Sequence, residues 1–340
     1  MTSKDIQKTV AVLVKDLTLR NKDVISRRFG LKNGKKETLE SIGKSYGITR
    51  ERVRQIEEFS LKQLSKFANS NADVASFVTW ARNTVDSNGG VLKERELFKV
   101  FSGQESDSQA NASLLFLLSV NGDLARSPEN DEFHSFWSVD AARADSFQAA
   151  TETLIKALEK NANVVPRNEL DAFASKNSVE NVATCFSVSK LIKGNMFDQV
   201  GLVAWPEVKP RGVKDKAYLV LKRANSPRHF GEIAKLINDV NFSDKKANTQ
   251  TVHNELIKDK RFVLVGRGMY ALSQWGYPEG TVKDVLVDIL KKSSKPIAKE
   301  SLVAKVKDVR LVKENTILLN LQDAKIFSKK EDGTYVLRKA

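Results

Sequence analysis

The stretch Thr38–Glu58, TLESIGKSYGITRERVRQIEE, decides the fold of the first part of this 340-residue chain. Thr38 and Thr49 are residue types that cap helix N-termini, and each precedes a segment whose apolar residues have helical spacing. Gly47 suits the positive φ of a tight turn and ends the first of the two segments. The pattern predicts two short helices joined by a turn, which is the helix-turn-helix arrangement.

The second predicted helix has one apolar face and one polar face. Val53 and Ile56 lie three residues apart and are expected in the core. The opposite face carries Arg50, Glu51, Arg54 and Gln55. Arginine donates bidentately to guanine, glutamine suits adenine and a carboxylate accepts from the cytosine amino group, so this face could read base edges. A solvated, charge-rich helix face would have the same periodicity, so periodicity alone does not distinguish it from a DNA-reading face. The order of the residues can distinguish the two.

The order of residues resembles region 4 of the sigma-70 family of bacterial sigma factors, over about residues 5–67. The positions that carry the resemblance are Arg27–Leu31, Thr38–Glu40, Ile42, Gly43, Gly47–Glu57, Leu61 and Leu64. What the resemblance implies is a −35-like promoter element read by Arg50, Glu51, Arg54 and Gln55. It also implies that Thr49 and Arg52 lie near phosphates, where we also expect Thr38, and that the RNA polymerase core is a partner. Glu58 and Phe59 depart from the small and basic residues usual in the family.

The position of this segment in the chain differs from that in sigma factors. The family carries region 4 at the C-terminus, behind a region that melts the −10 element with clustered aromatic residues. Here the segment comes first, and no matching aromatic-rich helix follows in the remaining residues. This order favours a promoter-binding or polymerase-associated regulator over a promoter-opening sigma factor.

Charge is distributed unevenly along the chain. Residues 1–70 hold 16 Lys/Arg against 8 Asp/Glu, residues 71–210 hold 13 against 19, and residues 211–340 hold 27 against 15. Basic ends are typical of proteins that bind a polyanion, although lysine-rich surfaces also serve solubility. The single cysteine, Cys185, excludes an internal disulfide and, with no export signal, indicates a cytoplasmic setting. The densest apolar run, Leu114–Val120, is too short to span a membrane.

A weak repeat of about 60 residues follows the helix-turn-helix four times, each copy with three helices and then two β-like runs, as in a winged helix. The fold class is therefore mainly α with small β wings, an N-terminal helix-turn-helix bundle followed by tandem winged-helix-like units. The expected domains are residues 1–68, 72–141, 143–209, 213–277 and 280–340. Plain helical packing is the alternative for the first two copies.

The third copy, from Lys214 to about Gly276, resembles the HARE-type winged-helix family, which includes the delta subunit of some bacterial RNA polymerases. The run from His229-Phe230 to Arg267–Leu272 carries this resemblance. Gly266-Arg267-Gly268 predicts a hairpin turn. Arg267 at its tip could enter a narrow minor groove or simply be solvated, and we expect it to contact DNA phosphates together with Lys258, Lys260 and Arg261.

No catalytic, metal or cofactor site is predicted. The three histidines, His134, His229 and His253, lie in different copies without metal-ligand spacing. No nucleophile elbow, phosphate-binding loop or paired-cysteine motif is present. The four tryptophans are more consistent with core anchors than with a base-stacking platform.

These patterns lead to one functional hypothesis and two alternatives. The first is a sequence-specific DNA-binding transcription protein that binds double-stranded DNA and RNA polymerase, expected to be monomeric because coiled-coil heptads are missing. An interaction scaffold that only docks on polymerase is the second. The third, a DNA-targeting subunit of a restriction or defence system, follows from fusions known in the HARE-type family.

Overall fold

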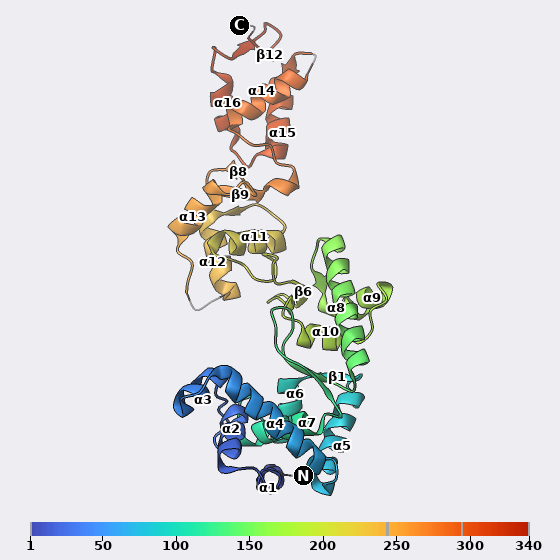
Figure 1. The fold of residues 1–340 in the computed structure, drawn as a ribbon. Helices are drawn as coiled ribbons and strands as arrows, with labels where there is room; N and C mark the ends of the chain where they lie inside the picture. Colours follow the sequence, from blue (N-terminus) through green and yellow to red (C-terminus); the bar gives the residue numbers. More distant parts are fainter. Residues whose placement is uncertain (1, 243–244, 294, 339–340) are drawn as a thin grey trace. The chain divides into compact units, whose positions relative to one another are not determined.

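The computed structural model describes residues 2–242, 245–293 and 295–338. The chain forms two compact units, Met1–Gly194 with Asp198–Val203 and Asn195–Phe197 with Ala204–Ala340. Both consist of helices with short antiparallel strands (Figure 1). The predicted fold class, mainly α with small β wings, is confirmed.

The first unit begins with the predicted helix-turn-helix. Its four helices are α1 (Ser3–Leu13), α2 (Leu19–Phe29), α3 (Leu39–Tyr46) and α4 (Arg50–Ala68). The Thr38 hydroxyl accepts a hydrogen bond from the Ser41 amide, and the Thr49 hydroxyl accepts one from the Arg52 amide, so both predicted N-caps are confirmed. Gly47 ends α3 with a φ of 63°, as the turn requires.

Threonine and asparagine side chains also cap the neighbouring helices. Thr2 caps α1, which ends at Leu13. Thr18 caps α2, and its hydroxyl accepts a hydrogen bond from the Asn21 amide. A short connection, residues 69–71, separates α4 from α5 (Ala72–Ser87), and the Asn71 side chain caps α5 by accepting hydrogen bonds from two amides of its first turn.

A largely buried helix joins the helix-turn-helix to the first repeat. This helix, α7 (Gln109–Asn121), buries every residue from Ala110 to Leu118. It packs against α1, α2, α4, α5 and α6 (Glu94–Ser102), so one apolar core includes residues on both sides of the expected boundary at residues 68–72. Phe29 meets Phe116 edge-on at 5.1 Å, and the Gln109 amide donates to the Leu31 carbonyl at 2.9 Å. The helix-turn-helix therefore shares one apolar core with residues of α7, a helix that begins only at Gln109.

The four repeats share one order of elements: helix, short strand, two helices, and a β-hairpin. In each three-stranded sheet the order is first, third, second strand. The strands of the first unit are β1 (Val91–Lys93), β2 (Ala125–Ser127), β3 (Phe136–Ser138), β4 (Val165–Pro166), β5 (Ile192–Gly194) and β6 (Gln199–Leu202). Its remaining helices are α8 (Ala141–Asn161), α9 (Leu170–Lys176), preceded by the 3₁₀ turn Arg167–Glu169, and α10 (Val182–Val188).

The third and fourth repeats belong to the second unit, each with its own apolar core. The helices are α11 (Val213–Ala224), α12 (Phe230–Val240), α13 (Thr249–Lys258), α14 (Val282–Lys292), α15 (Lys299–Val309) and α16 (Glu314–Leu321). The strands are β7 (Arg228–His229), β8 (Phe262–Gly266), β9 (Met269–Leu272), β10 (Ile297–Ala298), β11 (Phe327–Lys329) and β12 (Thr334–Leu337), with a 3₁₀ turn at Ser273–Trp275. The winged-helix assignment and the five-domain division stay predictions.

The repeats contain one element that the sequence did not predict. The first strand of each repeat was not expected, because β1, β4, β7 and β10 have only two or three residues and show no periodicity. In the second repeat the third helix, α10, is limited to Val182–Val188, and it follows Asn181, which lies in the left-handed region with a φ of 52°.

The hairpin of the third repeat packs against the segment between α15 and α16 of the fourth repeat. β8 and β9 are joined by Arg267-Gly268, as the Gly-Arg-Gly turn predicted. The Leu311 amide donates to the Val265 carbonyl at 2.7 Å. Arg310, only 3% exposed, donates to the carbonyls of Leu264, Pro278 and Gly280. One edge of this hairpin is therefore occupied within the molecule.

Cys185 and Trp137 lie in the core of the first unit. Cys185 is fully buried, and burial raises the pKa of its thiol. Trp137 is also buried, which supports a core role for that tryptophan. In the part of the chain that the structure describes, no helix is long and apolar enough to cross a bilayer.

Candidate nucleic-acid interface

A small apolar cluster fixes the orientation of α4. Val24 of α2, Ile42 of α3, and Val53 and Ile56 of α4 are buried together. Because residues three apart in a helix lie on one side, anchoring Val53 and Ile56 turns the remaining side of α4 outward. The cluster thus places Arg50, Glu51, Arg54 and Gln55 on the surface, where all four are exposed.

Gly43 lets the two helices of the motif approach closely. A Cβ at this position would lie 2.7 Å from the Ile48 carbonyl oxygen, inside any normal contact. The Ile48 amide also donates to the Gly43 carbonyl at 3.0 Å. The angle at which α4 leaves the turn therefore depends on glycine here.

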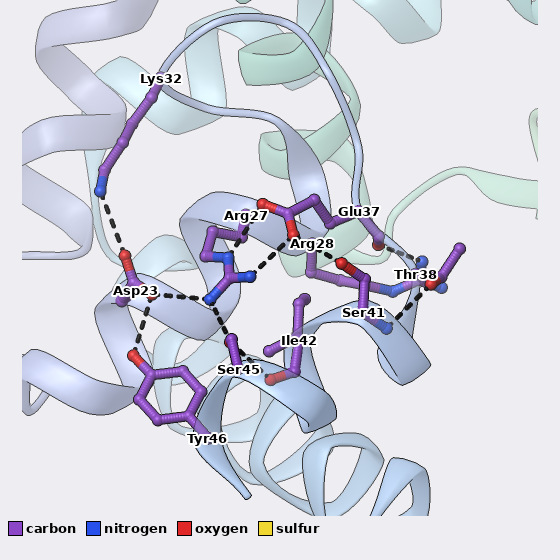
Figure 2. A network of polar contacts seen from close by, with 10 residues as sticks. All are labelled: Asp23, Arg27, Arg28, Lys32, Glu37, Thr38, Ser41, Ile42, Ser45 and Tyr46. Carbon is purple, nitrogen blue, oxygen red and sulfur yellow. Dashed lines mark hydrogen bonds and ion pairs between the residues drawn. The ribbon is translucent and has the colours of Figure 1, made fainter.

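Arg27 ties α2 to the rest of the motif (Figure 2). Its Nε and Nη2 donate to the two carboxylate oxygens of Glu37 at 2.9 and 2.8 Å. Its Nη1 donates to the Ser45 hydroxyl of α3 at 2.7 Å. The Ser41 hydroxyl donates to Glu37 at 3.0 Å, and these bonds lower the pKa of the Glu37 carboxyl. A bidentate pair of this kind holds its groups in one orientation.

Asp23 forms the other half of the network in Figure 2. The Tyr46 hydroxyl donates to it at 2.9 Å and the Lys32 ammonium at 3.1 Å. Although burial opposes ionisation, these two donors hold the pKa of the Asp23 carboxyl below its usual value. Sequence analysis noted Arg27 only as part of a resemblance and missed Asp23 and Glu37, because no local spacing joins residues ten or more positions apart.

The exposed face of α4 carries its own ion pairs. Arg54 donates to Glu51 through Nη2 at 2.7 Å and through Nε at 2.9 Å, and its Nη1 bonds to Glu58. These bonds lower the pKa of the Glu51 carboxyl. Arg52 donates to the Gln55 side chain at 2.9 Å, whereas Arg50 has no ion pair among the described residues. Arg54 and Gln55 must exchange these contacts for base edges if they read DNA.

The hydroxyls of Thr38 and Thr49 cap helices, which places both residues at helix N-termini. A helix N-terminus presents free amides to an anion, so a phosphate contact at either residue is compatible with its capping role. Arg52, in the first turn of α4 after Thr49, is exposed. Phosphate contacts at these three residues stay predictions.

The predicted phosphate-binding residues of the third repeat differ in their surroundings. Lys258 and Lys260 are exposed. Arg261 instead donates to Asp259 at 2.7 Å and to Asp215 at 2.8 Å, so its charge is already compensated. Arg267 is also exposed, at the turn whose strand packs against Leu311, and it lines a cavity together with residues of the fourth repeat. Lys258, Lys260 and Arg267 are therefore the accessible cations of this group.

Metal-ligating residues are not grouped in the described ranges: no three His, Cys, Asp or Glu side chains come together as a metal site would require. The candidate interface therefore consists of the exposed face of α4 and the charged side chains around it.

Comparison with known proteins places the resemblance in the first part of the chain. Residues 13–66 match the family model "Sigma-70, region 4". The chain is 52% identical over 48 residues to "RNA polymerase sigma factor SigA" from Bacillus sp., an alignment that covers 14% of this chain and 13% of that protein. The helix-turn-helix described above therefore lies in a segment similar to region 4 of sigma factors, and the similarity covers a small part of either protein.

Proposed function

We propose that this chain is a DNA-binding protein of the transcription machinery that reads a promoter-type, −35-like element with the exposed face of α4 and associates with RNA polymerase. The observation that carries the proposal is the exposed set Arg50, Glu51, Arg54 and Gln55 at the start of α4. These side chains lie in the segment that matches sigma-70 region 4.

The chemistry of this face suits the major groove. The first residues of a recognition helix reach base edges, and Arg54 and Gln55 lie in the first two turns of α4. A guanidinium donates bidentately to guanine and a glutamine amide pairs with adenine. The net charge of +8 over residues 1–70 adds attraction to phosphates, which supplies affinity without sequence information.

Association with RNA polymerase is supported by the similarity to a sigma factor, a protein whose name includes the polymerase. The test is co-purification of core RNA polymerase with the full chain. Retention of the enzyme is expected with wild type and with an Arg54→Ala/Gln55→Ala variant, because the altered face is assigned to DNA. If wild type does not retain the polymerase, this part of the proposal is wrong.

The DNA-reading role is tested by selection from randomised duplexes with full-length wild type and the Arg54→Ala/Gln55→Ala variant. The salt concentration is held at about 0.15 M, because phosphate contacts make affinity depend steeply on salt. A matched control, Glu40→Ala/Lys44→Ala, alters two exposed residues of α3 that pair with each other at 3.9 Å.

Wild type and the control are expected to enrich one short motif, and the Arg54→Ala/Gln55→Ala variant is expected to lose preference at one or two positions of it. Enrichment of the same motif by all three proteins would show that α4 does not read DNA. Binding to polymerase without any sequence preference would favour a scaffold that docks on the enzyme.

A further inference from the structure

The outer face of α13 carries uncharged hydrogen-bonding side chains. Val252 and Leu256 are buried in the core of the third repeat and anchor the helix. Five exposed residues lie on one side of the helix, Gln250, Thr251, Asn254, Ile257 and Lys258, and Thr249 is exposed at its first position. Amides and hydroxyls on a stable helix face are the groups that pair with base edges.

The first turns of α13 are fixed by local bonds. The Asn248 side chain caps the helix by accepting from the Gln250 amide at 2.8 Å and from the Thr251 amide at 3.3 Å. The Gln250 side-chain amide donates to the Asn254 side-chain oxygen at 3.3 Å, which aligns the two groups. Gln250 and Asn254 are the second and sixth residues after the cap. Glu51 and Gln55 occupy the same two positions in α4.

Positive charge surrounds this face. Lys246 lies just before α13, and Lys258 and Lys260 lie at its end and just beyond. All three are exposed, and within the described ranges no ion pair neutralises them. Glu255 is the acid of α13, and it is half-buried at the border of this face, one turn from Thr251 and Lys258. Such a surface attracts phosphates on both sides of the helix.

The corresponding helix of the fourth repeat, α16, shares only part of this pattern. Asn315 and Thr316 are exposed uncharged polar residues in its first turn. The position that Asn254 has in α13 is taken by Leu319, which is 66% exposed, and α16 contains Glu314 but no lysine or arginine. The pair of exposed amides one turn apart, with a lysine on the same helix, is therefore a property of α13 and not of α16.

From these observations we propose that α13 is a second DNA-reading helix, which enters the major groove at A·T-rich sequence. Gln250 and Asn254 pair with adenine, the methyl groups of Thr251 and Ile257 contact thymine methyls, and Lys246, Lys258 and Lys260 bind the flanking phosphates. One edge of the hairpin of the third repeat is occupied by Leu311, and its turn carries the exposed Arg267.

This inference extends the proposed function but does not depend on α4. The test is a selection from long randomised duplexes with four full-length proteins at about 0.15 M salt. They are wild type, Gln250→Ala/Asn254→Ala, Arg54→Ala/Gln55→Ala, and the matched control Asn315→Ala/Thr316→Ala on α16. The affinity of each protein for the enriched duplex is then measured at the same salt concentration. Circular dichroism checks that each variant is folded.

Wild type and the α16 control are expected to enrich an A·T-rich segment that Gln250→Ala/Asn254→Ala loses, with affinity falling by about tenfold for each lost base contact. The Arg54→Ala/Gln55→Ala variant is expected to keep this segment, even if the α4 proposal fails. The inference is overturned if Gln250→Ala/Asn254→Ala enriches the same sequences with wild-type affinity. It is equally overturned if the α16 control causes the same loss.

Discussion

Gly43 lies where α3 and the turn approach most closely, and it leaves no room for a side chain. A Cβ there would meet the Ile48 carbonyl at 2.7 Å, so Gly43→Ala must push the turn outward. We expect the change to destabilise the first unit by about 1–3 kcal/mol, as overpacking does. Urea unfolding followed by circular dichroism measures this.

The matched control for this prediction is Gly194→Ala in the same unit, where the nearest atom to the new Cβ would lie at an ordinary 3.6 Å. If both variants unfold at the same urea concentration as wild type, Gly43 does not set the approach of the helices.

Glu58 competes with DNA for Arg54. It bonds to the Arg54 guanidinium on the exposed face of α4. We expect Glu58→Ala to strengthen DNA binding several-fold, because it frees one guanidinium edge and removes a negative charge near the phosphates. Fluorescence anisotropy with a labelled duplex gives the affinity.

Glu40→Ala on α3 removes the same charge without freeing Arg54, and is expected to strengthen binding less. Equal gains for Glu58→Ala and Glu40→Ala would mean that only net charge matters.

Glu37 links the stability of the motif to pH. Its bonds to Arg27 hold the pKa of its carboxyl below the ordinary value of 4.5. A carboxyl whose pKa is lowered in the folded state stabilises the fold at pH values above its ordinary pKa. This contribution to stability is lost as the pH falls through the folded-state pKa. Glu37→Gln is therefore expected to unfold at lower urea than wild type at pH 7. The two proteins should converge below the folded-state pKa, so a difference that persists unchanged in acid would contradict this explanation.

At the scale of elements, α7 completes the core of the helix-turn-helix. Its residues from Leu114 to Leu118 are buried in the same cluster as Ile6, Val10 and Leu64. A fragment of residues 1–70 would expose those residues to water, so we expect it to lack a cooperative urea transition, whereas residues 1–141 should keep one. A sharp transition in the shorter fragment would show that the motif folds without α7.

The caps and turns of these elements could be predicted from the sequence, whereas their long-range contacts could not. The caps at Thr38 and Thr49 and the turn at Gly47 were predicted, because each depends on residues within four positions. The role of α7 and the Arg27–Glu37 pair were not, because they depend on contacts that only the folded chain brings together. The Gly-Arg-Gly turn was predicted, but its packing against Leu311 was not.

At the scale of the whole molecule, the two basic ends of the chain each present a helix with side chains suited to bases. Residues 1–70 carry a net charge of +8 and residues 211–340 a net charge of +12, with a net −6 between them. Phosphate attraction alone would bind any duplex, so only discrimination between sequences separates a reader from a basic surface.

The most direct measurement of this claim is the affinity of full-length wild type and Arg54→Ala for two duplexes at one salt concentration. One carries the sequence enriched by wild type, and the other has a single guanine of that element replaced. Wild type should discriminate between them by about 1–3 kcal/mol, and Arg54→Ala should lose that discrimination while still binding both. Equal discrimination by the two proteins would contradict the assignment of α4 as the reader of the promoter-type element.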